Sequence, residues 1–142
     1  EPAAPGVAGR AGGDGDGNVM DRIRISRLLL PVRIGVGARE RRARQTVCAE
    51  VVLELDLAAA SRSDRLGDTV DYAALADRLR ASASESCRLL EALAGRLAAV
   101  CLAEPRVAAA EVTLTKVRAR PGLNASVTVR RGRAPGKRRA TS

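Results

Sequence analysis

Residues 47–57 alternate between two kinds of side chain. One set is entirely apolar (Val47, Ala49, Val51, Leu53, Leu55 and Leu57), whereas the intervening set is more polar (Cys48, Glu50, Val52, Glu54 and Asp56). Because successive side chains of a strand point to opposite faces, this pattern predicts a long, half-buried antiparallel strand. Such a strand needs partner strands beside it and a layer that covers its apolar face.

Three further stretches alternate in the same way and predict three more strands. The first begins at Asp21 and runs to residues 28–30, where we expect Pro31 to bend or end it. The others are residues 110–116 and residues 123–129, separated by a plausible turn at Pro121-Gly122. Residues 33–44 are expected to form a loop rich in Gly and Arg, and residues 58–68 a mostly polar connection.

Two segments carry apolar residues at helical spacing. One helix is expected from about Asp71, with Leu75 and Leu79 on its inner side, and residues 82–86 interrupt it. The second is expected from about Cys87 to Ala103, before Glu104-Pro105. The element order predicts an α+β fold, in which two helices cover one face of a four-stranded antiparallel sheet (ββααββ). Self-association would protect the sheet's edges and its other face.

The chain of 142 residues is long enough for one domain with a core. We expect residues 1–19 to be a flexible leader, residues 20–130 the folded domain, and residues 131–142 a basic flexible tail. No stretch approaches the ~18 apolar residues of a membrane span, so we expect no membrane partner. The three cysteines form no close pair, which indicates neither a disulfide framework nor a zinc site. We therefore expect a cytoplasmic protein.

The formal net charge of +9 is most concentrated in residues 130–142, which hold six basic residues and no acid. Such a tail can attract phosphate non-specifically. Without interleaved aromatic residues, however, it offers no stacking platform for bases, so we expect no specific nucleic-acid partner. A non-catalytic oligomer that binds phosphate or nucleic acid through this tail stays an alternative function.

The chain contains no His, Phe or Trp. The lack of His excludes Ser-His and Cys-His nucleophile schemes and His-ligated metal sites. Proton transfer is left to carboxylates, cysteines, lysines and the sole aromatic residue, Tyr72, at a predicted helix start. Lys116, one of only two lysines, lies beside apolar strand positions.

Two carboxylates are further candidates for a site. Glu91 falls in the first turns of the second predicted helix, where it could accept paired hydrogen bonds from an amidine-like edge. Glu40 is the one acid in an arginine-rich loop. Each candidate also has a commoner structural interpretation, which is a core-packed tyrosine, a solvated lysine, a helix-surface glutamate or a weak surface ion pair.

Four segments in order carry a resemblance to a known family. They are Ile34-Gly35-Val36 followed by Glu40 and Gln45, residues 68–72 ending in Tyr72, residues 89–94, and residues 112–116 ending in Lys116. Together they resemble the dihydroneopterin aldolase family of folate biosynthesis over roughly residues 20–130. The resemblance implies the tunnelling fold, in which sheets of several subunits join into a barrel, as a tetramer or octamer with active sites between subunits.

The resemblance also implies retro-aldol cleavage of dihydroneopterin to hydroxymethyl-dihydropterin and glycolaldehyde, with no metal, other cofactor or lysine Schiff base. Glu91 would anchor the amino-pyrimidine edge of the pterin, helped by the backbone of Leu90. Lys116 would transfer protons through water, and Tyr72 of the adjacent subunit would assist. Glu40 would hold the hydroxylated side chain of the substrate.

Two positions depart from the family pattern. Gly37-Ala38-Arg39 stands where family members often have an aromatic residue, and Val117 replaces a frequent proline. The same groups would also serve an epimerase that acts on dihydroneopterin or its triphosphate, since cleavage and re-addition at the other face give an epimer. The arginines of residues 39–44 could accommodate a triphosphate, so this alternative stays open.

Overall fold

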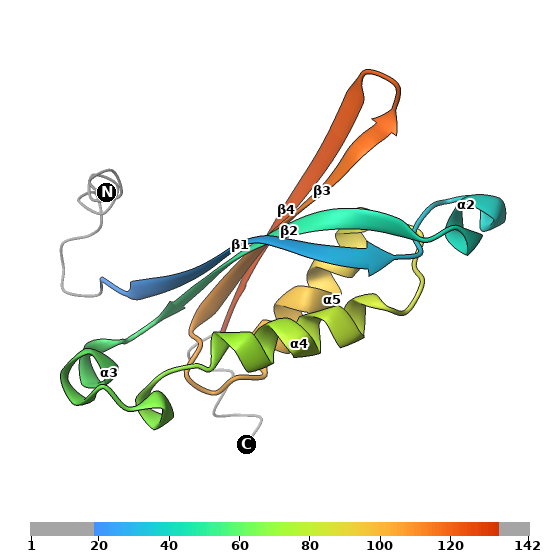
Figure 1. The fold of residues 1–142 in the computed structure, drawn as a ribbon. Coiled ribbons are helices and arrows are strands. Elements are labelled where there is room, and N and C mark those ends of the chain that lie inside the picture. Colours follow the sequence, from blue (N-terminus) through green and yellow to red (C-terminus); the bar gives the residue numbers. More distant parts are fainter. Residues whose placement is uncertain (1–18, 134–142) are drawn as a thin grey trace.

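The computed structural model describes residues 19–133, and most of the predicted leader and tail lie outside them. Four strands form one antiparallel sheet in sequence order. They are β1 (Asp21–Val32), β2 (Gln45–Leu55), β3 (Ala109–Arg120) and β4 (Leu123–Gly132) (Figure 1). Strands β1 and β4 are therefore the two edges of this sheet.

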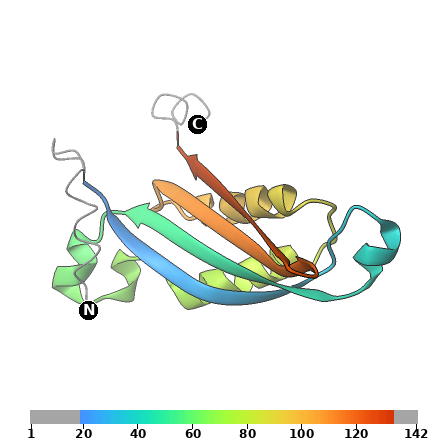
Figure 2. The ribbon, with the colours of Figure 1, turned by 90° about the horizontal axis from the view of Figure 1, so that it is seen from above.

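Two long helices, α4 (Tyr72–Ala83) and α5 (Leu90–Leu102), lie on the same face of the sheet (Figure 2). The carboxylate of Asp71 caps α4 by accepting a hydrogen bond from the amide of Ala74 at 3.1 Å. The predicted ββααββ fold is confirmed. Short helices stand at opposite ends of the sheet, with α2 (Ala38–Arg42) at one end and α3 (Ala58–Ser63) and η1 (Leu66–Asp68) at the other (Figure 1).

The core lies between the sheet and the two helices. The apolar row predicted along residues 47–55 is fully buried, and the inner residues of β3 and of both helices complete the core, namely Ala110, Val112, Leu114, Leu75, Leu79, Leu93 and Leu97. Each buried leucine contributes about 1.5–3 kcal/mol relative to an exposed one. Leu, Val, Ala, Ile and Cys side chains thus fill a core without any aromatic ring.

Strand β1 ends at Val32, one residue after Pro31, close to the point where the proline was expected to bend or end it. A bulge between Ile25 and Leu28 shifts the register, with Arg27 at φ 54°, and the strand continues to Val32. The bulge lets both halves of the strand present apolar side chains to the core. Proline is tolerated there because β1 is an edge strand.

The sequence missed three short helices and misplaced two boundaries of longer elements. The predicted loop at residues 33–44 contains α2, and the predicted connection at residues 58–68 contains α3 and η1. Helix α5 begins at Leu90 instead of about Cys87, and β3 continues beyond Lys116 to Arg120. The short helices α2, α3 and η1 bury no residue, so they leave no apolar periodicity in the sequence.

The sheet face opposite the helices carries polar cross-strand contacts. Arg130 of β4 donates two hydrogen bonds to Glu54 of β2 at 3.1 and 3.2 Å. This contact lowers the pKa of the Glu54 carboxyl, although partial burial opposes the shift. Hydroxyl pairs link β3 to β4, including Thr113 with Thr128 at 2.8 Å. No helix within residues 19–133 has both the length and the apolarity required to cross a bilayer.

Replacing Leu97 with Ala should reduce the free energy of unfolding by about 2–5 kcal/mol, because the change leaves a cavity between α5 and the sheet. Urea unfolding followed by circular dichroism measures this loss. Leu66→Ala is the matched control, since Leu66 is 62% exposed and its truncation should change stability by less than about 0.5 kcal/mol. Equal losses in both variants would contradict the assignment of the core.

Candidate active site

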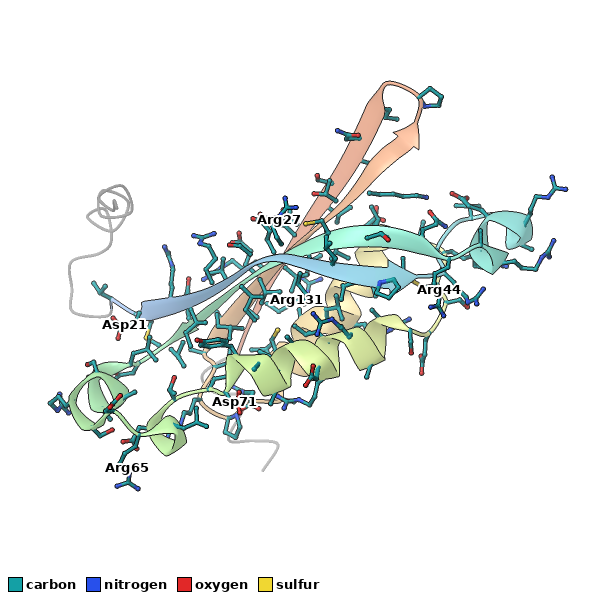
Figure 3. The ribbon with its side chains drawn as sticks, viewed as in Figure 1. Asp21, Arg27, Arg44, Arg65, Asp71 and Arg131 are labelled. Atoms are coloured by element: carbon teal, nitrogen blue, oxygen red, sulfur yellow. The ribbon has the colours of Figure 1, made fainter. Side chains whose placement is uncertain are left out.

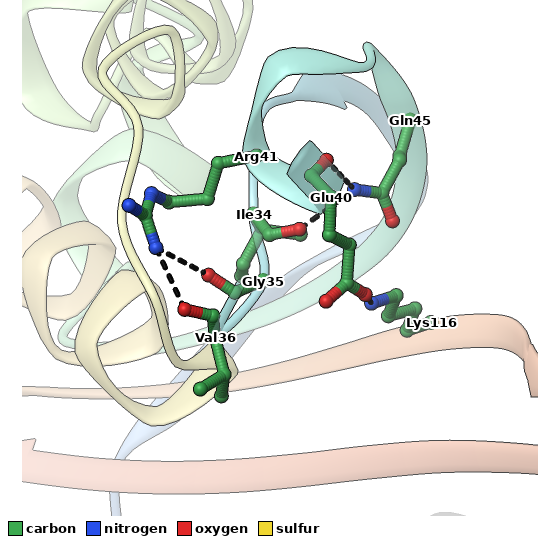
Figure 4. Close-up of polar contacts among 7 residues, drawn as sticks. All are labelled: Ile34, Gly35, Val36, Glu40, Arg41, Gln45 and Lys116. Carbon is green, nitrogen blue, oxygen red and sulfur yellow. Dashed lines mark hydrogen bonds and ion pairs between the residues drawn. The ribbon is translucent and has the colours of Figure 1, made fainter. Parts of the chain in front are cut away.

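Hydrogen bonds from side chains fix the segment that carries Glu40 (Figure 4). The Arg41 guanidinium donates to the carbonyl oxygens of Gly35 at 3.1 Å and Val36 at 2.9 Å. The Gln45 amide donates to the carbonyl oxygen of Ile34 at 2.6 Å and to that of Glu40 at 3.3 Å. Helix α2 has only five residues and buries none of them, so these contacts set its position.

Gly35 allows the Glu40 side chain to pack directly against the backbone. Its φ of +153° is rarely adopted by residues with side chains, and a Cβ added at this position would overlap the Glu40 carboxylate group. The Glu40 side chain therefore packs directly on the backbone at Gly35.

Glu40 and Lys116 are brought into direct contact although 76 positions separate them. The Lys116 ammonium donates to Glu40 Oε2 at 2.8 Å (Figure 4). The Lys116 side chain is 18% exposed and that of Glu40 is 46% exposed, so the pair lies partly in solvent. An ion pair of this exposure contributes about 0–1 kcal/mol to stability. The ion pair therefore matters less for stability than for holding an amine in a defined position beside a carboxylate.

The start of α5 is tied to the same segment. Ile34 forms a parallel bridge with Cys87, and the Gly35 amide donates to the Cys87 carbonyl at 3.2 Å. Helix α5 begins three residues later at Leu90, and Glu91 lies exposed in its first turn, as predicted. Within residues 19–133 no side chain pairs with the Glu91 carboxylate, so it is open to a ligand near the positive end of the helix.

Tyr72 does not join this group within one chain. It is the first residue of α4 and is 61% exposed, which contradicts a core-packed tyrosine. Helix α4 starts at the α3 end of the molecule, whereas α2 lies at the other end (Figure 1). The 12 residues of α4 span about 18 Å. Tyr72 is thus about one helix length away from the end of α4 that leads into α5.

The residues that hold Glu40 in place were only partly foreseen from the sequence. Gln45 stood out as a possible motif residue without a role, and Arg41 was indistinguishable from its arginine neighbours. The Arg41 guanidinium donates its hydrogen bonds to backbone carbonyls, and such contacts leave no signature in the amino-acid pattern. Among residues 19–133 no three His, Cys, Asp or Glu side chains cluster in a way that could hold a metal ion.

The fold and this site define a class of protein, an α+β sheet protein with an amine–carboxylate site at one open end of its sheet. A family model for dihydroneopterin aldolase matches residues 23–131. The chain belongs to the dihydroneopterin aldolase family.

Two relatives and two solved structures support this assignment. The dihydroneopterin aldolase of Methylorubrum extorquens is 39% identical over 100 residues, which cover 69% of this chain and 77% of the relative. That of Streptomyces coelicolor is 37% identical over 98 residues, covering 68% and 82%. An E. coli dihydroneopterin aldolase solved in complex with neopterin superposes with a TM-score of 0.76, at 26% identity over 80% of this chain and 100% of that one. A Vibrio cholerae structure described as a dihydroneopterin aldolase gives 0.75, at 28% identity over 80% and 98%.

Gly35→Ala should displace Glu40 from Lys116, because a Cβ at position 35 overlaps the Glu40 side chain. If Glu40 and Lys116 act together, the variant should lose about tenfold or more in kcat/KM on dihydroneopterin, equivalent to ~1.4 kcal/mol. Steady-state kinetics on the folded variants measures this. Gly37→Ala is the matched control, since a Cβ at Gly37 meets nothing within 4 Å. Full activity of Gly35→Ala would show that the packing of Glu40 is irrelevant.

Proposed function

We propose that this chain is a dihydroneopterin aldolase, which cleaves dihydroneopterin to hydroxymethyl-dihydropterin and glycolaldehyde. The observation that carries the proposal is the Lys116–Glu40 contact at 2.8 Å beside the start of α5. The identity of 37–39% to two dihydroneopterin aldolases supports it. So does the solved complex of the E. coli relative with neopterin.

Glu91 and Leu90 anchor the substrate in this proposal. The amino-pyrimidine edge of a pterin presents neighbouring N–H donors, and a carboxylate can accept two of them in parallel. Glu91 suits this role because it is exposed and no side chain within the described residues occupies it. The backbone of Leu90, the first residue of α5, adds a further polar contact to the ring.

Lys116, Tyr72 and Glu40 serve the bond cleavage. A proton leaves the middle hydroxyl of the three-carbon substrate side chain, the C–C bond between the first and second side-chain carbons breaks, and its electron pair moves into the ring imine. Glycolaldehyde departs, and the remaining carbon of the side chain then takes up a proton. Lys116 relays these protons through water, and Tyr72 assists at the side-chain carbons. Glu40 holds the hydroxyls and keeps the ammonium in place.

The reaction proposed here needs neither a metal nor a Schiff base. The ring imine of the substrate takes the electron pair, a task that a metal ion or an iminium would otherwise perform. A Schiff base also requires a substrate carbonyl, whereas the side chain of dihydroneopterin carries hydroxyls. Lys116 as an ammonium paired with Glu40 has no free electron pair for attack, which favours a role in proton transfer.

A homo-oligomer with sites between subunits completes the proposal. Within the described residues, β1 and β4 are sheet edges without a neighbouring strand, and such edges favour pairing with another copy. Tyr72 lies at the opposite end of the molecule from α2, and it is exposed. A neighbouring subunit can bring its Tyr72 to the Lys116 of the first, whereas one chain cannot.

Purified protein incubated with dihydroneopterin should release glycolaldehyde and hydroxymethyl-dihydropterin in equal amounts. Chromatography of the pterins and a colorimetric aldehyde assay measure the two products. The appearance of the epimer without glycolaldehyde would replace the aldolase by the epimerase, since re-addition would then outpace release. Absence of both products would leave a non-catalytic binding protein.

Lys116→Ala should lower kcat by about 10²–10⁴-fold, the usual contribution of a positioned proton donor or acceptor. Lys116→Arg is the sharper variant, because it keeps a positive charge beside Glu40 but a guanidinium does not give up its proton near neutral pH. Both variants should fail in turnover while retaining the size of the wild-type oligomer in gel filtration. Wild-type turnover by Lys116→Arg would reduce the role of Lys116 to electrostatics.

Mixing inactive variants tests the shared site. Lys116→Ala and Tyr72→Phe should each be impaired, and subunits exchanged between them after mild dissociation should regain activity. Recovery is expected because some interfaces then combine an intact Lys116 with an intact Tyr72 from the neighbour. The comparison is with each variant carried through the same procedure by itself. No gain on mixing would place both groups in one chain and contradict the proposal.

A further inference from the structure

A small pocket at the α2 end of the sheet is lined by three arginines. It has a volume of about 160 Å³ and lies between the end of β1, the start of β2 and the end of α4. Its lining residues are Pro31, Val32, Arg33, Arg44, Arg80 and Ser84. Figure 3 labels Arg44 at this end of the molecule. Among the residues that the structure describes, no acidic side chain lines the pocket, and none of the residues assigned to the aldolase site belongs to it.

The three guanidinium groups keep hydrogen-bond donors for a ligand. Arg44 makes no side-chain hydrogen bond or ion pair within the described residues. Arg33 uses Nη1 for the carbonyl oxygen of Arg42 at 2.5 Å, which orients its guanidinium. Arg80 contacts Asp77 at 3.4 Å, but the Asp77 side chain is 80% exposed, so water screens this attraction. A guanidinium carries several N–H donors, and one contact leaves the others available.

The size and chemistry of the pocket select a class of ligand. Pockets for drug-sized molecules hold about 300–1,000 Å³, so this one admits only a small group. Three positive charges without a lining acid attract an anion, and planar guanidinium forks match the oxygens of phosphate in pairs. The Ser84 hydroxyl lines the same pocket and can add a neutral hydrogen bond.

The mouth of the pocket is exposed at the end of the edge strand β1. Pro31 has no N–H to donate, so this end of the edge is poorly suited to strand pairing with another copy. Arg33 and Arg44 are both exposed. Space for an approaching anion is therefore present at the mouth of the pocket.

We propose that Arg33, Arg44 and Arg80 form a binding site for a phosphate group, either free phosphate or the phosphoryl group of a small metabolite. The site is separate from the Lys116–Glu40 pair and does not depend on the aldolase assignment. It is connected to α2, however, because Arg33 binds the last carbonyl of that helix at Arg42. An occupied site would hold the arginines on both sides of α2 in one arrangement.

Isothermal titration calorimetry on the full chain tests the site, in a phosphate-free buffer of low ionic strength. The probes are inorganic phosphate, glycerol 3-phosphate and, as a comparison anion, chloride. Saturable binding of either phosphate probe, with none for chloride, is expected. Tighter binding of glycerol 3-phosphate would indicate a phosphorylated metabolite, and equal or weaker binding would indicate free phosphate. Absence of saturable binding by both phosphate probes would overturn the proposal.

The double variant Arg44→Gln/Arg80→Gln should weaken phosphate binding by about tenfold or more, because each lost charged hydrogen bond costs at least that factor. The matched control is Arg62→Gln/Arg65→Gln, which removes the same charge at the α3 end of the molecule. Thermal melting checks that both variants are folded. An equal loss in the control would show that net charge attracts the anion, and it would overturn the pocket as the site.

Discussion

Burial of the apolar row along β2 is the constraint on which the rest of the structure depends. Five inner residues of this strand are fully buried, and β1 and β3 pair with it on either side. The register of β1 and β3 follows, because a slip of one residue would turn their apolar side chains toward solvent. The bulge in β1 satisfies this requirement where the sequence loses its alternation at Ser26 and Arg27.

The candidate site forms where this buried row ends. On β3, Ala110, Val112 and Leu114 are buried, and the next position on the same face is Lys116. The strand thus projects an amine out of the apolar layer just beyond the helices. The carboxylate that meets it comes from α2, whose place is fixed by Arg41 and Gln45 rather than by packing. Packing positions the amine, and polar contacts to the backbone position the acid.

Much of the fold could be predicted from the sequence, because the apolar residues of the strands and of the long helices recur with the period of each structure. The alternation at residues 47–55 and the leucine spacing of α5 both arise from burial on one side. The short helices could not be predicted, since α2 and α3 bury nothing and so impose no pattern. Pro31 was a useful marker, since β1 ends one residue after it, and proline is tolerated there because β1 is an edge strand.

The candidate site was predictable only in its composition. The residue types of Glu40, Glu91, Lys116 and Tyr72 could be read from the sequence, but their distances could not. The contact of Glu40 with Lys116 depends on the backbone at Gly35, whose conformation is set by its hydrogen bond to Cys87. That bond joins the segment after β1 to the connection between α4 and α5, and no local pattern encodes such a contact. The candidate side chains could be predicted from the sequence, whereas the contacts between them depend on the tertiary structure.

The composition of the chain also explains why the proposed catalysis is tied to assembly. Tyr72 is the only aromatic residue, so no second ring near Lys116 could replace it. It is held at the start of α4, and α4 is a packed element whose inner leucines are fully buried. Bringing Tyr72 to Lys116 within one chain would require that helix to leave the core, at a cost of several kcal/mol. Association of a second copy displaces no packed element, and the edges that β1 and β4 form in the described part of the chain favour it. In the proposed enzyme, the rigidity of the monomer is therefore what makes a neighbouring subunit necessary.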